Sequence, residues 1–209
     1  MYKNSEFYKF VDRFDTGNGM KRPLLESNYK DLLGNYDVVM GMPGIGKTSA
    51  CSSQIRPCFI DLDSFEYHYE VPEHLKHLSF EQLKGHNDLV EKENWLEGYL
   101  DVIESKVKRS ESPVPLVNAR VDILEGLVKR GIRVLVVLPR MDDYYSAVER
   151  LLYRNEGAIP QEEIIVWYFN LYKQMSEYKG VPKMYIHIHL FPAILGSLKK
   201  LGVFGREVN

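Results

Sequence analysis

The sequence is poor in cysteine and contains no long apolar run. Its two cysteines are Cys51 and Cys58, and we expect a reducing cytosol to keep both as thiols without a chemical role. No segment approaches the roughly 18 uninterrupted apolar residues of a membrane span, and charged residues interrupt the N-terminal segment where a signal peptide needs an apolar stretch. These absences predict a cytoplasmic protein without a membrane partner.

An excess of charge of one sign is also missing. Basic residues number 27 and acidic residues 29, which gives a formal net charge of −2 at pH 7. Such a chain has no overall field that recruits a polyanion, so binding of a long nucleic acid is disfavoured, although a local basic patch is left open. Hydrophobic residues make up 44% and charged residues 27% of the 209 residues. This mixture and length predict one globular domain, with room for an inserted lid or cap.

Short apolar runs alternate with amphipathic stretches from residue 36 onward. We predict strands at residues 36–40, 57–63, 112–119, 132–138 and 184–190. We predict helices from residue 47 and over residues 79–109, 120–130, 141–154, 161–178 and 192–201. This alternation predicts an α/β three-layer fold around a mostly parallel, five-stranded sheet, with ligands at the carboxyl ends of the strands.

A glycine-rich segment lies between the first predicted strand and the first predicted helix. Residues 41–48, called here the glycine loop, match the Walker A pattern G-x-x-x-x-G-K-T. Glycines in that position let backbone N–H groups converge on phosphate oxygens at a helix N-terminus; the alternative is a turn that binds nothing. Lys47 is expected to reach the β- and γ-phosphates of ATP, and Thr48 to bind Mg²⁺. The predicted ATP-binding residues are Gly41, Gly44, Ile45, Gly46, Lys47, Thr48 and Ser49.

Two aspartates end the second predicted strand. Asp61 and Asp63 are two residues apart, so in an extended backbone both side chains leave the same face, close to the glycine loop. We hypothesise that Asp61 binds Mg²⁺ or its water and that Asp63 positions the attacking oxygen of the acceptor and could deprotonate it, although these roles could be exchanged. Alternatively, Asp63 and Ser64 cap the next helix. No other predicted strand ends in an obvious Walker B aspartate, which disfavours the motor and switch NTPases.

Arginines are the candidates for the cations that phosphoryl transfer requires, because charge accumulates on the γ-oxygens in the transition state. Arg154 is the predicted catalytic arginine of a lid, beside Lys47 and Asp63 as the other catalytic candidates. Arg140 and Arg150 are further lid candidates, and Arg150 is also a candidate for substrate binding. Arg120 follows the third predicted strand, where it could bind a phosphate of the acceptor. The alternative is ordinary helix charge paired with neighbouring glutamates.

Aromatic and histidine residues suggest weaker hypotheses. Five of them could stack a base in an acceptor pocket, and packing of the core or cap explains them equally well: Tyr67, His68, Tyr69, Trp95 and Tyr99. His187 and His189 share one face of the last predicted strand at the spacing of a two-ligand metal site. Because no cysteine, histidine or acidic cluster lies nearby in the sequence, we predict no metal there.

The segments GMPGIGKTS and FIDLDSF together resemble the nucleoside monophosphate kinase-like group of P-loop proteins, and are also similar to zeta-toxin kinases and to the kinase half of polynucleotide kinases. A longer likeness, up to about residue 175, is to small bacteriophage P-loop kinase-like proteins, through residues 61–64, 131–139 and 150–155. It implies ATP and Mg²⁺ as ligands of Lys47, Thr48, Asp61 and Arg154. It also implies a deoxynucleotide kinase in the cytoplasm of the phage host.

The combined expectation is a kinase domain over residues 36–209, with a cap near 64–111 and a lid near 140–160, preceded by an N-terminal extension over residues 1–35. The leading hypothesis is an ATP·Mg-dependent (deoxy)nucleoside monophosphate kinase whose partners are ATP and a small, nucleotide-like acceptor. The acceptor-phosphate signature of adenylate kinases is absent after the third strand, where only Arg120 occurs. Alternatives are a kinase of another hydroxyl acceptor (a polynucleotide end, a modified base in DNA or a nucleotide sugar) and a regulatory module that binds ATP without turnover. The oligomeric state is left open.

Overall fold

The structure is a computed structural model that describes residues 35–52, 59–78, 80–83, 86–109, 113–154, 159–188, 191–200 and 202–204. The predicted N-terminal extension lies outside these residues except for residue 35, and so does Cys58.

A five-stranded sheet forms the centre of the fold, and all four of its strand pairings are parallel. Its strand order is β2 (Phe59–Leu62), β5 (Val114–Asn118), β1 (Val38–Gly41), β6 (Val134–Pro139) and β7 (Lys183–Ile186). Every residue of β1 and β6 is buried, as their continuous apolar runs require when helices cover both faces of a sheet. The predicted α/β fold with a parallel, five-stranded sheet is confirmed.

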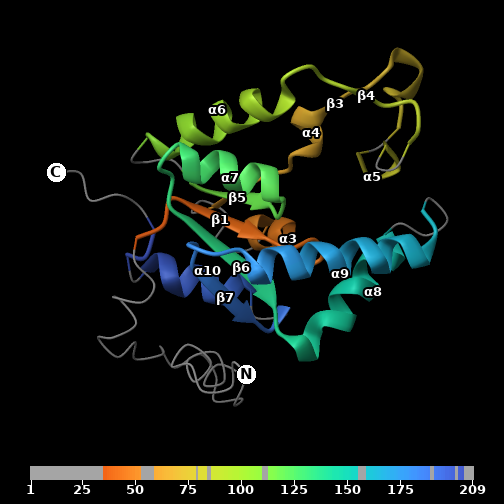
Figure 1. Ribbon diagram of the computed structural model, residues 1–209. Helices are drawn as coiled ribbons and strands as arrows, with labels where there is room; N and C mark the ends of the chain where they lie inside the picture. The colour runs from red at the N-terminus through yellow and green to blue at the C-terminus, as the bar shows by residue number, and fades with distance from the viewer. Residues whose placement is uncertain are drawn as a thin grey trace.

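Helices connect the strands and cover the sheet. Figure 1 shows α6 (Trp95–Val107) packed with α7 (Val121–Lys129) in the upper part of the view, and α8 (Tyr144–Arg154) paired with α9 (Gln161–Glu177) farther down and to the right. The short α3 (Lys47–Ser52) follows the glycine loop and contacts α10 (Phe191–Lys200). The buried residues of α9 recur every three or four positions, so one face of the helix packs on the core. Among the described residues, no helix is both long and apolar enough to cross a membrane.

The long helix predicted over residues 79–109 is wrong in its first half. The structure instead has the short α5 (Phe80–Leu83) and a two-stranded antiparallel ribbon of β3 (Tyr69–Glu70) and β4 (Val90–Glu91), before α6 begins at Trp95. Asn94 precedes α6 in the left-handed conformation, with φ of 53°. A right-handed helix cannot continue through such a residue, so α6 starts after it.

The last strand is shorter than predicted. β7 ends at Ile186, so His187 follows the strand, and His189 lies outside the described residues. The argument that both histidines share a strand face is therefore wrong for His187. The other predicted helices match the structure closely, except that a 3-10 turn over Met141–Asp143 precedes α8.

Candidate functional site

The glycine loop lies where the direction of chain connections changes. After β1 the chain passes to β2 and then to β5 on one side of β1, and later strands β6 and β7 lie on the other side. The loop leaves β1 between its neighbours: Met42 N–H donates to the Val137 carbonyl of β6 at 3.3 Å, and Ala119 N–H, just beyond β5, donates to the Gly41 carbonyl at 3.1 Å. Parallel α/β sheets bind ligands at such a switch point, outside the carboxyl ends of the strands.

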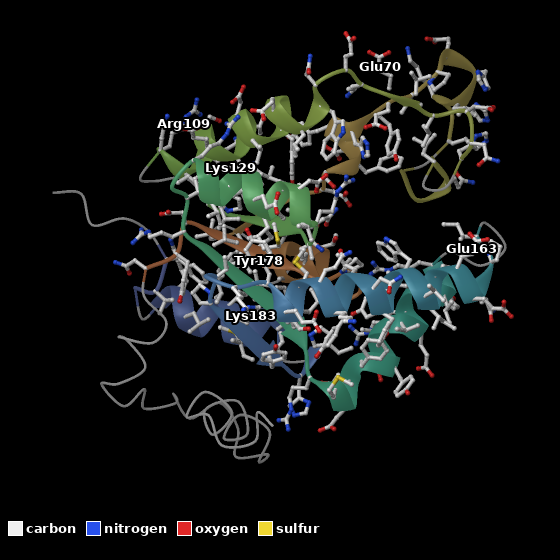
Figure 2. The ribbon with its side chains drawn as sticks, viewed as in Figure 1. Glu70, Arg109, Lys129, Glu163, Tyr178 and Lys183 are labelled. Atoms are coloured by element: carbon white, nitrogen blue, oxygen red, sulfur yellow. The ribbon has the colours of Figure 1, made fainter. Side chains whose placement is uncertain are left out.

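Two segments flank this edge of the sheet. In Figure 2, Glu70 of β3 and Glu163 of α9 lie toward the same end of the molecule, whereas Arg109 and Lys129, at the far ends of α6 and α7, lie toward the other end. The segment around β3 and β4 and the α8–α9 pair thus extend on either side of the strand ends. The segment around β3 and β4 falls within the predicted cap near 64–111, and α8 falls within the predicted lid near 140–160, whereas α9 follows that lid.

The backbone of the glycine loop requires glycine at two positions. Gly44 and Gly46 have φ of 77° and 101°, which L side chains rarely adopt. A Cβ at Gly44 would also lie 2.7 Å from the Ala147 carbonyl oxygen of α8, whereas one at Gly46 would meet no atom within 4 Å. Ile45 points its fully buried side chain into the core and so anchors the loop from beneath.

Lys47 and Ser49 occupy the first turn of α3. Lys47 is almost completely buried, and its Nζ donates to the Gly41 carbonyl at 3.3 Å, so the ammonium group lies back over the glycine loop. Ser49 is exposed. The ammonium of Lys47 therefore already lies at the loop that is predicted to hold phosphate.

Thr48 and Asp61 join the glycine loop to the second strand. The Thr48 hydroxyl donates to Asp61 Oδ2 at 2.6 Å. The other carboxylate oxygen, Asp61 Oδ1, is buried and has no hydrogen-bond partner among the described residues. Leaving a carboxylate oxygen buried and unpaired is costly, and a bound cation would satisfy it.

The donor set at Thr48 and Asp61 fits magnesium in particular. Among the described residues, no group of three or more His, Cys, Asp or Glu side chains could hold a metal by itself. Mg²⁺ is commonly held by one or two carboxylates, waters and the phosphate oxygens of a substrate, so one aspartate and one hydroxyl suffice. The orphaned Asp61 oxygen is the observation that supports such an ion.

Asp63 lies just beyond β2 and is oriented by β5. Its Oδ1 accepts a hydrogen bond from Asn118 Nδ2 at 2.8 Å and another from Phe65 N–H at 3.0 Å, at the start of α4 (Phe65–His68). The second contact lies at the entry to α4, but the N-cap residue of that helix is Ser64, which makes no side-chain capping hydrogen bond. Asn118 was not among the predicted site residues, although its position at the end of the apolar strand β5 was an available signal.

An aromatic stack lies between α4 and α6. The ring of His68 is stacked on Tyr69 with centroids 4.1 Å apart and on Trp95 with centroids 4.0 Å apart; we call these three residues the ring stack. Glu91 borders it, with Oε1 at 3.1 Å from His68 Nε2 and accepting a hydrogen bond from Trp95 Nε1 at 2.9 Å. The contact with His68 lowers the pKa of Glu91, an effect that Trp95 and Arg120 reinforce. The structure thus gathers aromatic residues that the sequence left undecided.

Arg120 joins the ring stack to the end of β5. Its guanidinium carbon lies 4.7 Å from the centre of the Trp95 ring, and Nη1 lies 3.3 Å from His68 Nδ1. Its Nε and Nη2 donate to the two carboxylate oxygens of Asp122, at 3.1 and 2.7 Å. Partial burial opposes ionisation of Asp122, but the paired guanidinium outweighs it and lowers the pKa of that carboxyl group. The sequence had not predicted the Asp122 partner.

Arg150 and Arg154 lie on one face of α8. Arg150 Nη1 donates to the Gly44 carbonyl at 3.3 Å, which joins this predicted lid arginine to the glycine loop. Both arginines line an open depression of about 360 Å³, together with Ser146, Glu149 and Tyr153. The structure therefore brings Arg150 to the loop and Arg154 to the same helix face.

Arg140, the third lid candidate, lies in a different cluster. Its Nη1 is 2.9 Å from His187 Nε2, and His187 Nδ1 is 2.7 Å from Asp143 Oδ2. A histidine between a guanidinium and a carboxylate in this order carries its proton on Nδ1 and accepts from arginine on Nε2. Arg140 and His187 thus tie the ends of β6 and β7 together.

Comparison with known proteins adds little to this description. No protein-family model matches the sequence, and no curated protein is similar to it. Among solved structures, 17 chains match, and one is an uncharacterized protein from Eubacterium ventriosum with a TM-score of 0.40 and 8% sequence identity. That match covers 79% of this chain and 99% of the other.

Proposed function

We propose that this protein is a phosphotransferase that binds ATP with Mg²⁺ in the glycine loop and transfers the γ-phosphate to a small, nucleotide-like acceptor. The observation that carries the proposal is the hydrogen bond of 2.6 Å from Thr48 to Asp61, together with the buried and unpartnered second oxygen of Asp61. It joins a Walker A sequence to a carboxylate at the sheet edge where α/β folds bind nucleotides.

The glycine loop supplies the binding site for the triphosphate. The positive φ of Gly44 and Gly46 supports a turn whose N–H groups can converge on phosphate oxygens. Lys47 exchanges the Gly41 carbonyl for the β- and γ-phosphates, since a charged phosphate is a stronger partner for an ammonium than a neutral carbonyl is. Thr48 and Asp61 hold the magnesium, which when bound neutralises charge on the phosphates.

Asp63 is the proposed partner of the attacking oxygen. Asn118 and the N–H of Phe65 both contact its Oδ1, so the carboxylate is held in one orientation at the end of β2. An oriented carboxylate can align the acceptor and take its proton during transfer. The ring stack lies beyond Asp63, on the elements that follow β2 and β4, and suits a nucleotide-like acceptor because aromatic rings stack on bases.

Arg150 and Arg154 are the proposed cations of a lid. Arg150 already contacts the glycine loop, so a short movement of its side chain from the Gly44 carbonyl brings it to a γ-phosphate. Arg154 lines the same depression one helical turn farther on. Positive charge at this position stabilises the charge that develops on the γ-oxygens during transfer.

The test is acceptor-dependent formation of ADP by purified protein with ATP and Mg²⁺, using a panel of nucleosides, nucleoside monophosphates, short oligonucleotides and nucleotide sugars. Lys47→Ala is expected to abolish both ATP binding and turnover. Lys129→Ala, at the end of α7, is the matched control and should leave both unchanged. ATP binding without transfer to any acceptor would favour the regulatory module, and the absence of Lys47-dependent ATP binding would refute the proposal.

A further inference from the structure

Arg120, a cation that contacts the ring stack, is already paired within the protein. Asp122 receives two hydrogen bonds from Arg120, one on each carboxylate oxygen, and the third guanidinium nitrogen faces His68. Bidentate pairs of this kind are the strong ones among charged hydrogen bonds, and they cancel the net charge of the arginine. Arg120 is therefore poorly placed to clamp a phosphate of the acceptor, which was the role predicted from the sequence.

Several carboxylates lie around this position. Glu91 also faces Arg120 across His68, so two acidic groups share one guanidinium. Asp61 and Asp63 lie on the neighbouring strand end, and their charges add to burial in raising the pKa of Tyr99, whose hydroxyl donates to the Leu62 carbonyl at 2.5 Å. Lys92 Nζ donates to the Glu66 carbonyl at 3.0 Å. A phosphate dianion placed between Asp63 and the ring stack would meet like charges on several sides.

The ring stack offers a surface for an uncharged ring. Tyr69 and Trp95, at its two ends, are half-buried, whereas His68 between them is buried. Glu91 and Arg120 hold Trp95 in place through its Nε1 and its ring face. A base that stacks on a fixed aromatic ring gains binding energy without needing a charged partner.

We propose, on the basis of the phosphotransferase function above, that the acceptor group is an uncharged hydroxyl on a nucleoside-like compound and that a phosphomonoester is rejected. The base lies against the ring stack, and the hydroxyl faces Asp63. The acceptor oxygen forms a bond to the γ-phosphorus of ATP, the bond from that phosphorus to the β–γ bridging oxygen breaks, and its electron pair leaves with ADP. Asp63 takes the hydroxyl proton. The product is a phosphomonoester, and no diphosphate forms.

The first experiment compares matched acceptors with γ-labelled ATP and Mg²⁺. Each nucleoside, including hydroxymethylated bases, is tested as the free nucleoside, as its 5′-monophosphate and within a short oligonucleotide blocked at both ends. We expect kcat/KM for phosphorylation of a hydroxyl, either on the free nucleoside or in the oligonucleotide, to be at least about tenfold higher than kcat/KM for phosphorylation of the 5′-phosphate of the monophosphate. The two hydroxyl arms show whether the acceptor is free or part of a strand.

The second experiment removes the negative charge that pairs with Arg120. Asp122→Asn preserves the shape of the side chain and its acceptor for the Ile123 N–H, but removes the paired charge. It is expected to raise the use of monophosphates relative to nucleosides by about tenfold. Asp101→Asn is the matched control, because Asp101 pairs with Arg130 on the far side of α6 and α7 and should not alter that ratio.

A third variant tests the ring stack without depending on Asp122. Trp95→Leu is expected to raise KM for the hydroxyl acceptor about tenfold with little change in kcat, whereas Trp167→Leu, an exposed tryptophan on α9, should change neither. Formation of nucleoside diphosphates at a higher kcat/KM than phosphomonoesters would overturn this inference while leaving the phosphotransferase intact. Lys47-dependent ATP binding without transfer to any hydroxyl would overturn it as well. Loss of ATP binding altogether would instead reject the underlying function.

Discussion

Arg150 donates a hydrogen bond from Nη1 to the carbonyl oxygen of Gly44, 106 residues earlier in the chain, at 3.3 Å. The same glycine is packed so closely against α8 that an added Cβ would lie 2.7 Å from the Ala147 carbonyl oxygen. The glycine loop and the helix that carries two lid candidates are therefore one packed unit. Small changes on either side should be felt by the other, because packed interiors transmit displacement.

Arg150→Ala is expected to reduce kcat by about a hundredfold, because it removes a cation from the neighbourhood of the transferred phosphate. Arg150→Lys should recover part of that loss, since it restores charge without the planar fork. Steady-state kinetics with ATP measure both effects. Lys173→Ala, an exposed charge on α9, is the control. An equal loss in that variant would mean that α8 and α9 charges act only through general electrostatics.

Asp61→Asn is expected to change activity and stability in opposite directions. The amide oxygen of the variant still accepts the Thr48 hydrogen bond, but the carboxylate charge, which has one buried oxygen without a partner, is gone. In the absence of ligands, Tm should therefore rise by about 2–4 °C. Turnover should fall by about a hundredfold and require more Mg²⁺. Thermal unfolding and a magnesium titration of kcat test the two parts. A variant that is less stable and keeps its magnesium dependence would contradict the proposed ion site.

Gly44→Ala is expected to destabilise the protein by about 3 kcal/mol, because strain from the positive φ adds to the close approach of Ala147. Gly180→Ala is a matched comparison, since Gly180 has φ of 81° and open space around its Cα. It should cost only the conformational strain, about 1 kcal/mol. Urea unfolding of both variants gives the difference. Equal destabilisation would show that the contact with α8 relaxes without cost.

Alkaline unfolding should depend on Tyr36. Burial raises the pKa of Tyr36 to about 12 from 10.0, although Arg133 opposes the shift. A group whose pKa is raised by folding contributes stability below its unfolded pKa, and that contribution is lost as pH rises from about 10 to 12. Tyr36→Phe should therefore make stability fall less steeply across this range, as measured by urea unfolding at several pH values. Tyr153→Phe, at an exposed position, should leave the slope unchanged.

Local patterns in the sequence sufficed for much of the fold. Val134–Pro139 is apolar throughout, and such a run is stable only as a strand covered on both faces, so β6 could be predicted without any partner. The helix over residues 79–109 failed because the hydrophobic spacing of α6 was extended backward across Asn94, whose left-handed conformation has no reliable sequence signal. Periodicity therefore identified the element but not its start.

The candidate site likewise has a part that local sequence predicted and a part that it did not. A continuous segment carries Gly44, Gly46, Lys47 and Thr48, so the chemistry of the glycine loop was readable from spacing alone. The partners of Asn118 and Glu91 could not be assigned from sequence, because each partner lies more than 20 positions away. Arg120 is a different case, because its partner Asp122 lies only two residues later, yet only the structure shows the two hydrogen bonds between them.

By itself, the sequence determined the order of the five sheet strands, the glycine loop and the aspartates at the end of β2, because these depend on residues close together in the chain. It did not determine the elements between β2 and α6. The tertiary structure alone decided that Thr48 meets Asp61, that Arg150 reaches Gly44, and that Arg120 is neutralised by Asp122 beside the ring stack. The physical reason is that charge pairing and burial depend on which side chains share a space. Only the packing of the sheet and its helices establishes that.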